Sequence, residues 1–141
     1  KRIVAISGSG ATCVMTADAA TDAGLSIAPL AKETRAALDK TLPTFATTTT
    51  PIALTAALLT NNGLFGEILP ILAKDQAADM FVIGMPVAGQ GYDVDLFARD
   101  TAAFASSSAL PHAMSPSPRT TAWAPPSSCA SSGYSVAWMP P

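Results

Sequence analysis

The sequence predicts a doubly wound α/β fold, in which helices cover both faces of a parallel β-sheet. Two short apolar segments, residues 4–6 and 79–86, are predicted as buried strands. The second is apolar almost throughout, which is typical of a parallel strand that is covered on both faces. A glycine turn and a helical pattern follow the first strand, and this alternation indicates a parallel sheet. Ligands bind beyond the carboxyl ends of such strands, so residues 8–12 and 85–92 are expected on one rim.

The first half of the chain contains two helical patterns, of which the first is the one that follows the glycine turn. Small and apolar residues at helical spacing predict a helix over residues 11–23, and Gly24 follows as the glycine that ends it. The short segment 25–27 is predicted as a strand. A charged surface helix is predicted over residues 32–42, and Pro43 closes it. The residues expected on its inner face are Leu38 and Leu42.

Turns and helices alternate in the next part of the chain. Residues 47–51 are predicted as a loop, because the residue before a proline avoids the helical region. Residues 61–63 are predicted as a turn. A helix is expected over residues 64–74, which Pro70 should kink or delay, and another over residues 94–104. The core residues expected on this last helix are Leu96, Phe97 and Phe104.

The composition changes abruptly near Ala105. Every acidic residue lies before this point, the last being Asp100, whereas Ser, Pro and Ala dominate residues 106–141 and Arg119 is their only ordinary charge. No helical or strand period is visible there, and prolines interrupt any ladder. The sequence therefore predicts a domain over residues 1–105 and a disordered tail over residues 106–141.

Two interpretations of this tail stay open. One is a linker or secretion-style tail. The other, which we favour, is that its codons are translated out of frame, because the tail is neither highly charged nor repetitive as solvated tails usually are. Three aromatic residues are expected to allow local collapse of the tail onto the domain. They are Trp123, Tyr134 and Trp138.

Composition also excludes several classes of function. Of the 141 residues, 49% are hydrophobic and 13% are charged, which favours a folded domain. The net charge of −2 gives no electrostatic reason to expect nucleic acid or an anionic membrane as a partner. No apolar run reaches the roughly 18 residues of a membrane span. Cys13 and Cys129 form neither a disulfide framework nor a metal-binding spacing, so no metal site is expected and a reducing cytoplasm is the expected compartment.

The candidate site is the start of the first helix, at Ser9, Gly10, Ala11 and Thr12. Backbone N–H groups at a helix start have no partner within the helix, and the helix dipole adds roughly half a positive charge. Such a turn favours an anion, commonly a phosphate, and the Thr12 hydroxyl is a possible further donor. The alternative is an ordinary tight turn without a ligand. Cys13 is expected to be a small core residue rather than a nucleophile.

Four acidic residues are assigned structural roles. Asp18 and Glu67 are expected to be solvated charges on helices. Asp93 and Asp95 are interpreted as a helix start, with Asp93 as the N-cap, rather than as a pair of catalytic carboxylates.

A series of ordered segments resembles the NDP-forming acyl-CoA synthetases, the relatives of succinyl-CoA synthetase and ADP-forming acetyl-CoA synthetase. The resemblance covers about residues 2–105. The segments that carry it include residues 3–18, 23–25, 33–34, 37–38, 42–43, 45–46, 50–55, 78–83 and 94–95. It points to the second flavodoxin-like, succinyl-CoA-ligase-type domain, between the domain with the active-site histidine and the ATP-grasp module.

This resemblance implies a ligase reaction in which an acid, CoA and a nucleoside triphosphate give acyl-CoA, nucleoside diphosphate and phosphate through a phosphohistidine. Ser9, Gly10, Ala11 and Thr12 would supply a helix N-terminus that stabilises the phosphohistidine. CoA, ATP or ADP, and Mg are implied for the parent enzyme, with CoA-binding and ATP-grasp domains or subunits as partners. The isolated chain is expected to be inactive and to bind no cofactor alone. The alternative is a stand-alone phosphate-binding or nucleotide-binding module without catalysis.

Three departures from the family pattern are visible. Thr50 and Ala53 replace the Asn and Asp of an Asn-Pro-hydrophobic-Asp motif. His112 stands in a Leu-Pro-His-Ala context rather than the Ser-His-Thr-Gly context of the phosphorylated histidine, so it does not inherit that role. A Lys-Pro-Val strand normally follows the helix near Phe104, and its absence here predicts an incomplete sheet.

Overall fold

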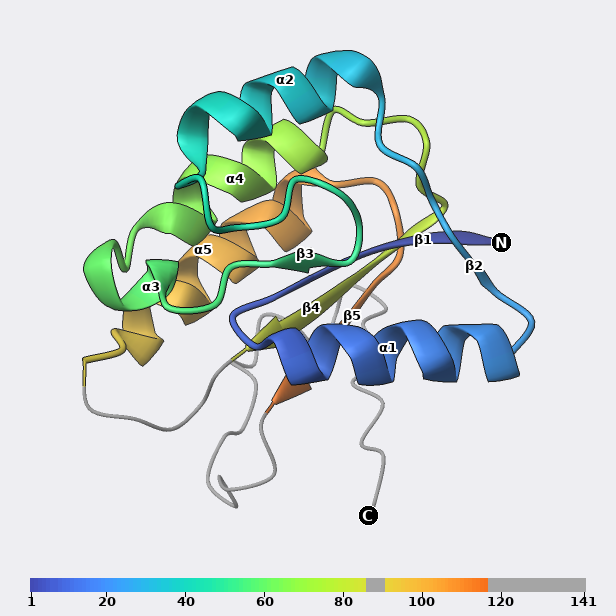
Figure 1. Cartoon of the computed structure of the whole chain (residues 1–141), viewed down its shortest axis with the longest axis horizontal. Helices are drawn as coiled ribbons and strands as arrows, with labels where there is room; N and C mark the ends of the chain where they lie inside the picture. Colours follow the sequence, from blue (N-terminus) through green and yellow to red (C-terminus); the bar gives the residue numbers. More distant parts are fainter. Residues whose placement is uncertain (86–90, 117–141) are drawn as a thin grey trace.

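The structure, a computed structural model, describes residues 1–85 and 91–116. Helices and strands alternate along these residues (Figure 1). The strands are β1 (Arg2–Ser7), β2 (Ser26–Ile27), β3 (Ile52–Ala53), β4 (Met80–Met85) and β5 (His112–Pro116). The helices are α1 (Gly10–Asp22), α2 (Lys32–Thr41), α3 (Ala57–Thr60), α4 (Leu64–Leu72) and α5 (Val94–Ser107).

All pairings in the sheet are parallel, and the strand order is β2-β1-β4-β5. The short strand β3 pairs with the last two residues of β1, whereas β2 pairs with its first two. The register places Ser7 beside Gly84, so the carboxyl ends of β1 and β4 meet at one rim. The predicted doubly wound α/β fold is confirmed.

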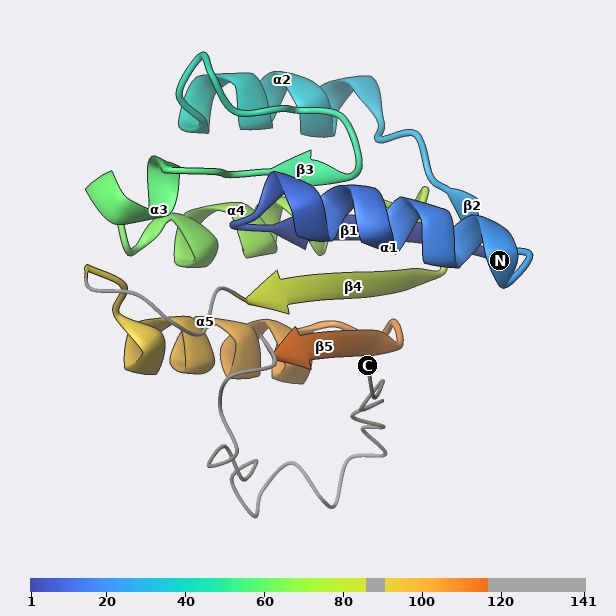
Figure 2. The same ribbon diagram turned by 60° about the horizontal axis from the view of Figure 1, so that its bottom comes forward.

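Helices cover the two faces of the sheet unequally. Among the described helices, α1 is the one on one face of the sheet, and α2, α4 and α5 lie on the other (Figures 1 and 2). We call these the α1 face and the α4 face. Helix α1 contacts β1, β2 and β3, and α4 packs between α2 and α5.

The main core lies between the sheet and the α4 face helices. Val4, Ile6, Phe81 and Ile83 alternate along β1 and β4 and point into it. Phe65 and Phe97 join α4 to α5 with ring centroids 5.5 Å apart. Burial of each such side chain stabilises the fold by about 1.5–3 kcal/mol before the cost of ordering it.

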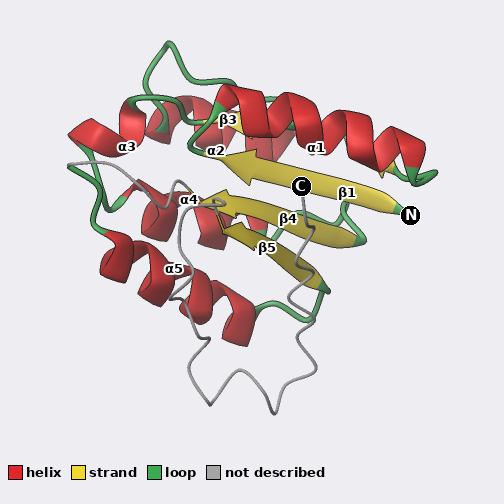
Figure 3. Cartoon of the chain, turned by 90° about the horizontal axis from the view of Figure 1, so that it is seen from below, coloured by secondary structure: helices red, strands yellow, loops and turns green. Residues whose placement is uncertain are grey.

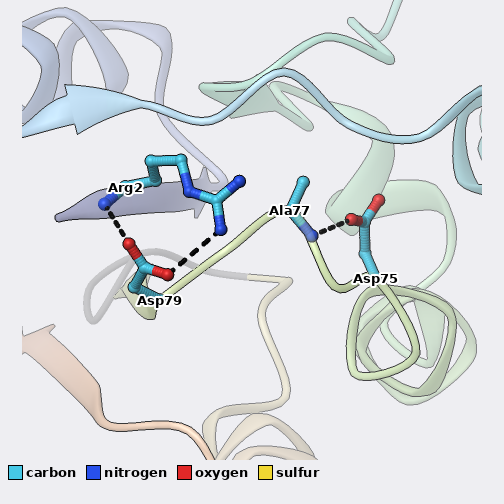
Figure 4. Close-up of polar contacts among 4 residues, drawn as sticks. All are labelled: Arg2, Asp75, Ala77 and Asp79. Atoms are coloured by element: carbon cyan, nitrogen blue, oxygen red, sulfur yellow. Dashed lines mark hydrogen bonds and ion pairs between the residues drawn. The ribbon is translucent and has the colours of Figure 1, made fainter.

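Two carboxylates fix the amino end of the sheet (Figure 4). Asp79 Oδ2 accepts a hydrogen bond of 2.8 Å from the Arg2 backbone N–H, and its Oδ1 lies 3.2 Å from Arg2 Nη2. These interactions with Arg2 lower the pKa of Asp79. Asp75 accepts hydrogen bonds from the backbone N–H groups of Ala77 and Ala31, at 2.7 and 2.9 Å. The starts of β1 and β4 and the loops beside them are thereby held together.

Most of the predicted elements up to α5 are present. Helix α1 ends as expected, with Gly24 at φ +69° and the Leu25 N–H donating to Ala20 O at 2.8 Å. Leu38 and Leu42 are buried as predicted. Helix α4 starts at Leu64, so Pro70 lies inside it and does not delay it.

Two short elements, α3 and β3, were not predicted from the sequence. Each is only a few residues long, and β3 exists because Ile52 and Ala53 pair with β1. A run of this length has no periodicity of its own to recognise.

The expectation that no strand follows residue 106 is wrong. Helix α5 continues to Ser107, and β5 then pairs with β4 from Phe81↔His112 to Met85↔Pro116. The sequence of β5 has little strand propensity, and its pairing with a central strand supplies the hydrogen bonds that its side chains do not predict. Residues 117–141, with Arg119 and the three tail aromatics, lie outside the described residues, as does most of the 85–92 loop. The two interpretations of the tail stay predictions.

Candidate functional site

A two-residue turn joins β1 to α1 at the carboxyl rim of the sheet. Ser9 is the N-cap of α1, with extended φ and ψ angles of −124° and 124°. Its Oγ accepts a long hydrogen bond of 3.4 Å from the Thr12 N–H, and its carbonyl accepts from the Cys13 N–H at 3.1 Å. Serine is among the residues that start helices best, so the sequence fixes this helix start locally.

The backbone N–H groups of the four predicted site residues differ in whether they already have a hydrogen-bond acceptor. The Ser9 N–H donates to Ser7 Oγ at 3.1 Å, and the Thr12 N–H donates to Ser9 Oγ. Within the described part of the chain, the N–H groups of Gly10 and Ala11 have no acceptor. These two groups start a helix of 13 residues that has no acidic residue in its first turn. The turn therefore offers two backbone donors and a positive dipole end to an anion.

Solvent reaches this turn. Ala11 is exposed, and Ser9, Gly10 and Thr12 are half-buried. A Cβ placed on Gly10 would have no atom within 4 Å, so the space beside its backbone is open. A ligand can approach the two donors without displacing a side chain from this position.

Gly84, which was not among the predicted site residues, lets the turn pack closely against the sheet. A Cβ at this position would lie 2.8 Å from Ser7 Oγ and 2.9 Å from Thr12 Cγ2. Only glycine lets β4 pass this close to the first turn of α1 without a shift. A glycine inside an apolar strand is the sequence signal for such an approach.

Cys13 lies next to the site and has a structural role. Its side chain is buried, and its Sγ donates to the carbonyl of Ile52 at 3.4 Å. Burial raises the pKa of the thiol, which disfavours the thiolate that a nucleophile needs. The expectation of a core cysteine is confirmed.

Threonines organise the loop that contains Thr50 and Ala53. Thr50 Oγ1 accepts from the Ala5 N–H at 3.2 Å, so this side chain binds the backbone of β1. Thr47 Oγ1 accepts from the Ala53 N–H at 2.8 Å. The hydroxyl groups in this loop therefore hold the loop itself beside β1.

The four acidic residues assigned structural roles lie as expected. Asp93 caps α5, because its Oδ1 accepts from the Leu96 N–H at 2.9 Å. Asp18, Glu67 and Asp95 are exposed. Glu67 also accepts a hydrogen bond from Asn61 Nδ2 at 3.0 Å.

His112 lies away from the rim. It is the first residue of β5, at the opposite end of this strand from the carboxyl rim. Its Nδ1 is 3.1 Å from the Leu110 carbonyl, and its ring meets the Phe104 ring edge-on with centroids 6.1 Å apart. These contacts place His112 in the packing between β5 and α5.

Two classes of feature are missing from residues 1–85 and 91–116. No group of three or more His, Cys, Asp or Glu side chains there is arranged to hold a metal ion. None of the described helices is long and apolar enough to cross a membrane.

Comparison with known proteins identifies the fold. No protein-family model and no curated protein sequence matches the chain. Among solved structures, it is similar to PH0766 from Pyrococcus horikoshii OT3, with a TM-score of 0.68 and 20% identity over 81% of this chain and 26% of that one. It is also similar to the dinucleotide forming acetyl-coenzyme A synthetase 1 of Ca. Korarchaeum cryptofilum, with a TM-score of 0.68 and 16% identity.

The synthetase matches in its apo form, over 83% of this chain and 26% of the synthetase. It matches equally in complex with phosphate and ADP, over 83% and 25%. The chain thus spans about a quarter of the length of the solved proteins that it resembles. At these identities the likeness is one of fold, and it corresponds to one part of a larger synthetase chain.

Proposed function

We propose that this chain is a flavodoxin-like domain of an NDP-forming acyl-CoA synthetase and that the start of α1 holds a phosphoryl group. The observation that carries the proposal is the pair of N–H groups on Gly10 and Ala11, which have no acceptor among the described residues at the rim where α/β sheets bind ligands. The structural likeness to part of an acetyl-coenzyme A synthetase supports it. The ordered sequence segments that resemble this family support it as well.

The parent reaction joins an acid to CoA while a nucleoside triphosphate becomes a diphosphate and phosphate. In this proposal the phosphoryl group travels on a histidine of a companion domain, and the start of α1 stabilises its negative charge. Phosphoryl transfer depends mainly on positioning and charge stabilisation, which backbone N–H groups and a helix dipole supply without a reactive side chain. A site made of Ser, Gly, Ala and Thr fits that task.

The remaining parts of the reaction belong to companion domains in this proposal. These are a CoA-binding domain, the histidine, and an ATP-grasp module that binds the nucleotide and Mg. The chain alone should therefore make no acyl-CoA from acid, ATP and CoA. Turnover by the purified chain would contradict the proposal that it is one domain of a larger enzyme.

Substituting Gly10 by proline tests the phosphate site directly. Proline is well tolerated at the first position of a helix, and the extended conformation of Ser9 suits a residue that precedes proline. G10P thus removes one of the two free donors with little expected change in the fold. Loss of a hydrogen bond to a charged group costs about 1.5 kcal/mol or more, so phosphate affinity should fall about tenfold.

The measurement is an NMR titration of the full chain with inorganic phosphate, following the amide signals of residues 9–12. G10A is the matched control, because it keeps the N–H and its Cβ meets no atom within 4 Å. Its phosphate affinity should stay close to that of the unmodified chain. Equal affinity in G10P and G10A, or no phosphate-dependent shift in these amides, would refute the site and favour the ordinary tight turn.

A further inference from the structure

Residues 61–63, which the sequence predicts as a turn, connect α3 to α4 beside the segment that leads into α5 (Figure 3). Asn62 joins these two parts of the chain through both polar atoms of its side-chain amide. Its Nδ2 donates to the Gly91 carbonyl at 3.1 Å, and its Oδ1 accepts from the Asp93 N–H at 2.8 Å. A carboxylate in this place could not make the first of these bonds, because it has no donor.

Asn62 is also followed by glycine, and this pair of residues favours deamidation, the conversion of the side-chain amide to a carboxylate. The backbone N of Gly63 attacks Cγ of Asn62, and glycine hinders this attack least because it has no side chain. The new N–Cγ bond replaces the Cγ–Nδ2 bond, and Nδ2 leaves as ammonia with the proton from the attacking nitrogen. Water then opens the resulting succinimide ring and gives aspartate or isoaspartate at position 62.

The attacking nitrogen of this reaction is held by a side chain rather than by a helix. The Gly63 N–H donates to Asn61 Oδ1 at 3.0 Å, and this hydrogen bond is exposed. Helix α4 begins only at Leu64, so the Gly63 N–H precedes the backbone hydrogen bonds of that helix. Asn62 and Gly63 are half-buried. Exposed hydrogen bonds in a turn open by local fluctuation, without unfolding of the core.

We propose that Asn62 deamidates in the folded chain and that the reaction frees Gly91 from the turn between α3 and α4. Release of the Gly63 N–H from Asn61 sets its rate. The nitrogen that leaves as ammonia is the atom that donates to Gly91, so both products lose this hydrogen bond. Each product also places a negative charge beside Asp93. The proposal does not depend on the phosphate site.

Peptide mapping of the full chain by mass spectrometry, during incubation in mildly alkaline buffer, measures the reaction. The tryptic peptide of residues 41–74 contains both asparagines of the chain, and its fragment masses distinguish Asn61 from Asn62. We expect conversion at Asn62 and not at Asn61. Conversion should be at least about tenfold slower in buffer than in urea, because several hydrogen bonds must open first.

Three variants separate the effect of the fold from the effect of the sequence. N61A frees the Gly63 N–H and should accelerate conversion about fivefold in buffer but not in urea. E67A is the matched control, because it also loses the hydrogen bond between Asn61 and Glu67 but keeps the one to Gly63. Its rate should stay close to that of the unmodified chain. G63A should suppress conversion in both solvents, and circular dichroism checks that each variant folds.

The rates and the structure of the product can each contradict the proposal. No conversion in buffer, equal rates in buffer and in urea, or a folded N61A that reacts no faster than E67A would overturn it. The comparison of buffer with urea needs no variant. Anion exchange isolates the deamidated chain by its added charge, and hydrogen exchange at the Asp93 N–H should be several-fold faster in it. Unchanged exchange there would refute the release of the segment before α5.

Discussion

Asp75 is the residue at which two loops meet. Asp75 is 3% exposed, and its carboxylate accepts hydrogen bonds from the N–H groups of Ala31, just before α2, and Ala77, before β4. Burial by itself would raise the pKa of Asp75, but hydrogen bonds from Ala77, Thr34 and Ala31 outweigh it and lower the pKa. A carboxylate next to a helix start also interacts favourably with the helix dipole.

This environment predicts how stability depends on pH. The folded pKa lies below the unfolded value of about 3.9, so the stabilisation is complete above that value and is lost as pH falls through the folded pKa. D75N should lower the free energy of unfolding at pH 7 by about 1.5–3 kcal/mol, since hydrogen bonds to a charged acceptor are lost. Below about pH 4 the difference from the unmodified chain should shrink.

Urea denaturation at pH 7, 5 and 3 measures this effect. D18N is the control, because Asp18 is exposed on α1, and it should change stability by less than about 0.5 kcal/mol. A constant difference between D75N and the unmodified chain at all three pH values would show that the charge of Asp75 is not what stabilises the loops.

At the scale of single elements, the ends of helices were the features that the sequence predicted best. Ser9 starts α1, Gly24 follows its end, and Asp93 starts α5, each as its local pattern predicts. These signals are local because a cap needs only the backbone of its own helix. Local signals do not decide the course of helix α4. Pro70 lies inside this helix, which packs against α2 and α5.

The N-cap of α5 can be tested by comparing the stabilities of two variants, D93A and D95A. D93A removes the hydrogen bond to the Leu96 N–H and should destabilise the chain by about 1 kcal/mol. D95A removes an exposed acidic residue from the same turn but leaves the cap, and should cost about 0.3–1 kcal/mol or less. Urea denaturation of both variants measures the difference. An equal loss in both would assign the effect to charge near the helix start rather than to the cap.

At the scale of the whole molecule, β5 shows that the folded unit extends past Ala105 to at least Pro116. The composition boundary at Ala105 falls inside α5, and the strand that follows is joined to β4 along its full length. This strand moves β4 from the edge of the sheet to its interior. Removal of β5 would leave β4 with unpaired backbone groups and expose the α4 face around Phe104 and Leu110.

Limited proteolysis tests this boundary. Cleavage requires local opening, and a strand paired with the interior of a sheet opens rarely. The smallest resistant core should therefore retain residues up to at least Pro116, as measured by mass spectrometry of the fragments. A resistant core that ends near Ala105 would contradict the inclusion of β5 in the folded unit.

The sequence by itself determined the doubly wound fold class, the strands at β1 and β4, the main helices and the start of α1. These features follow from periodicity and caps, which act over a few neighbouring residues. Only the tertiary structure decided the existence of β3 and β5, the close approach at Gly84 and the role of Asp75. Each depends on partners far away in sequence: β5 forms on β4, Gly84 must clear Ser7 and Thr12, and Asp75 binds Ala31. Which N–H groups remain free at the candidate site was likewise decided in three dimensions, because Ser7 and Ser9 accept two of the four.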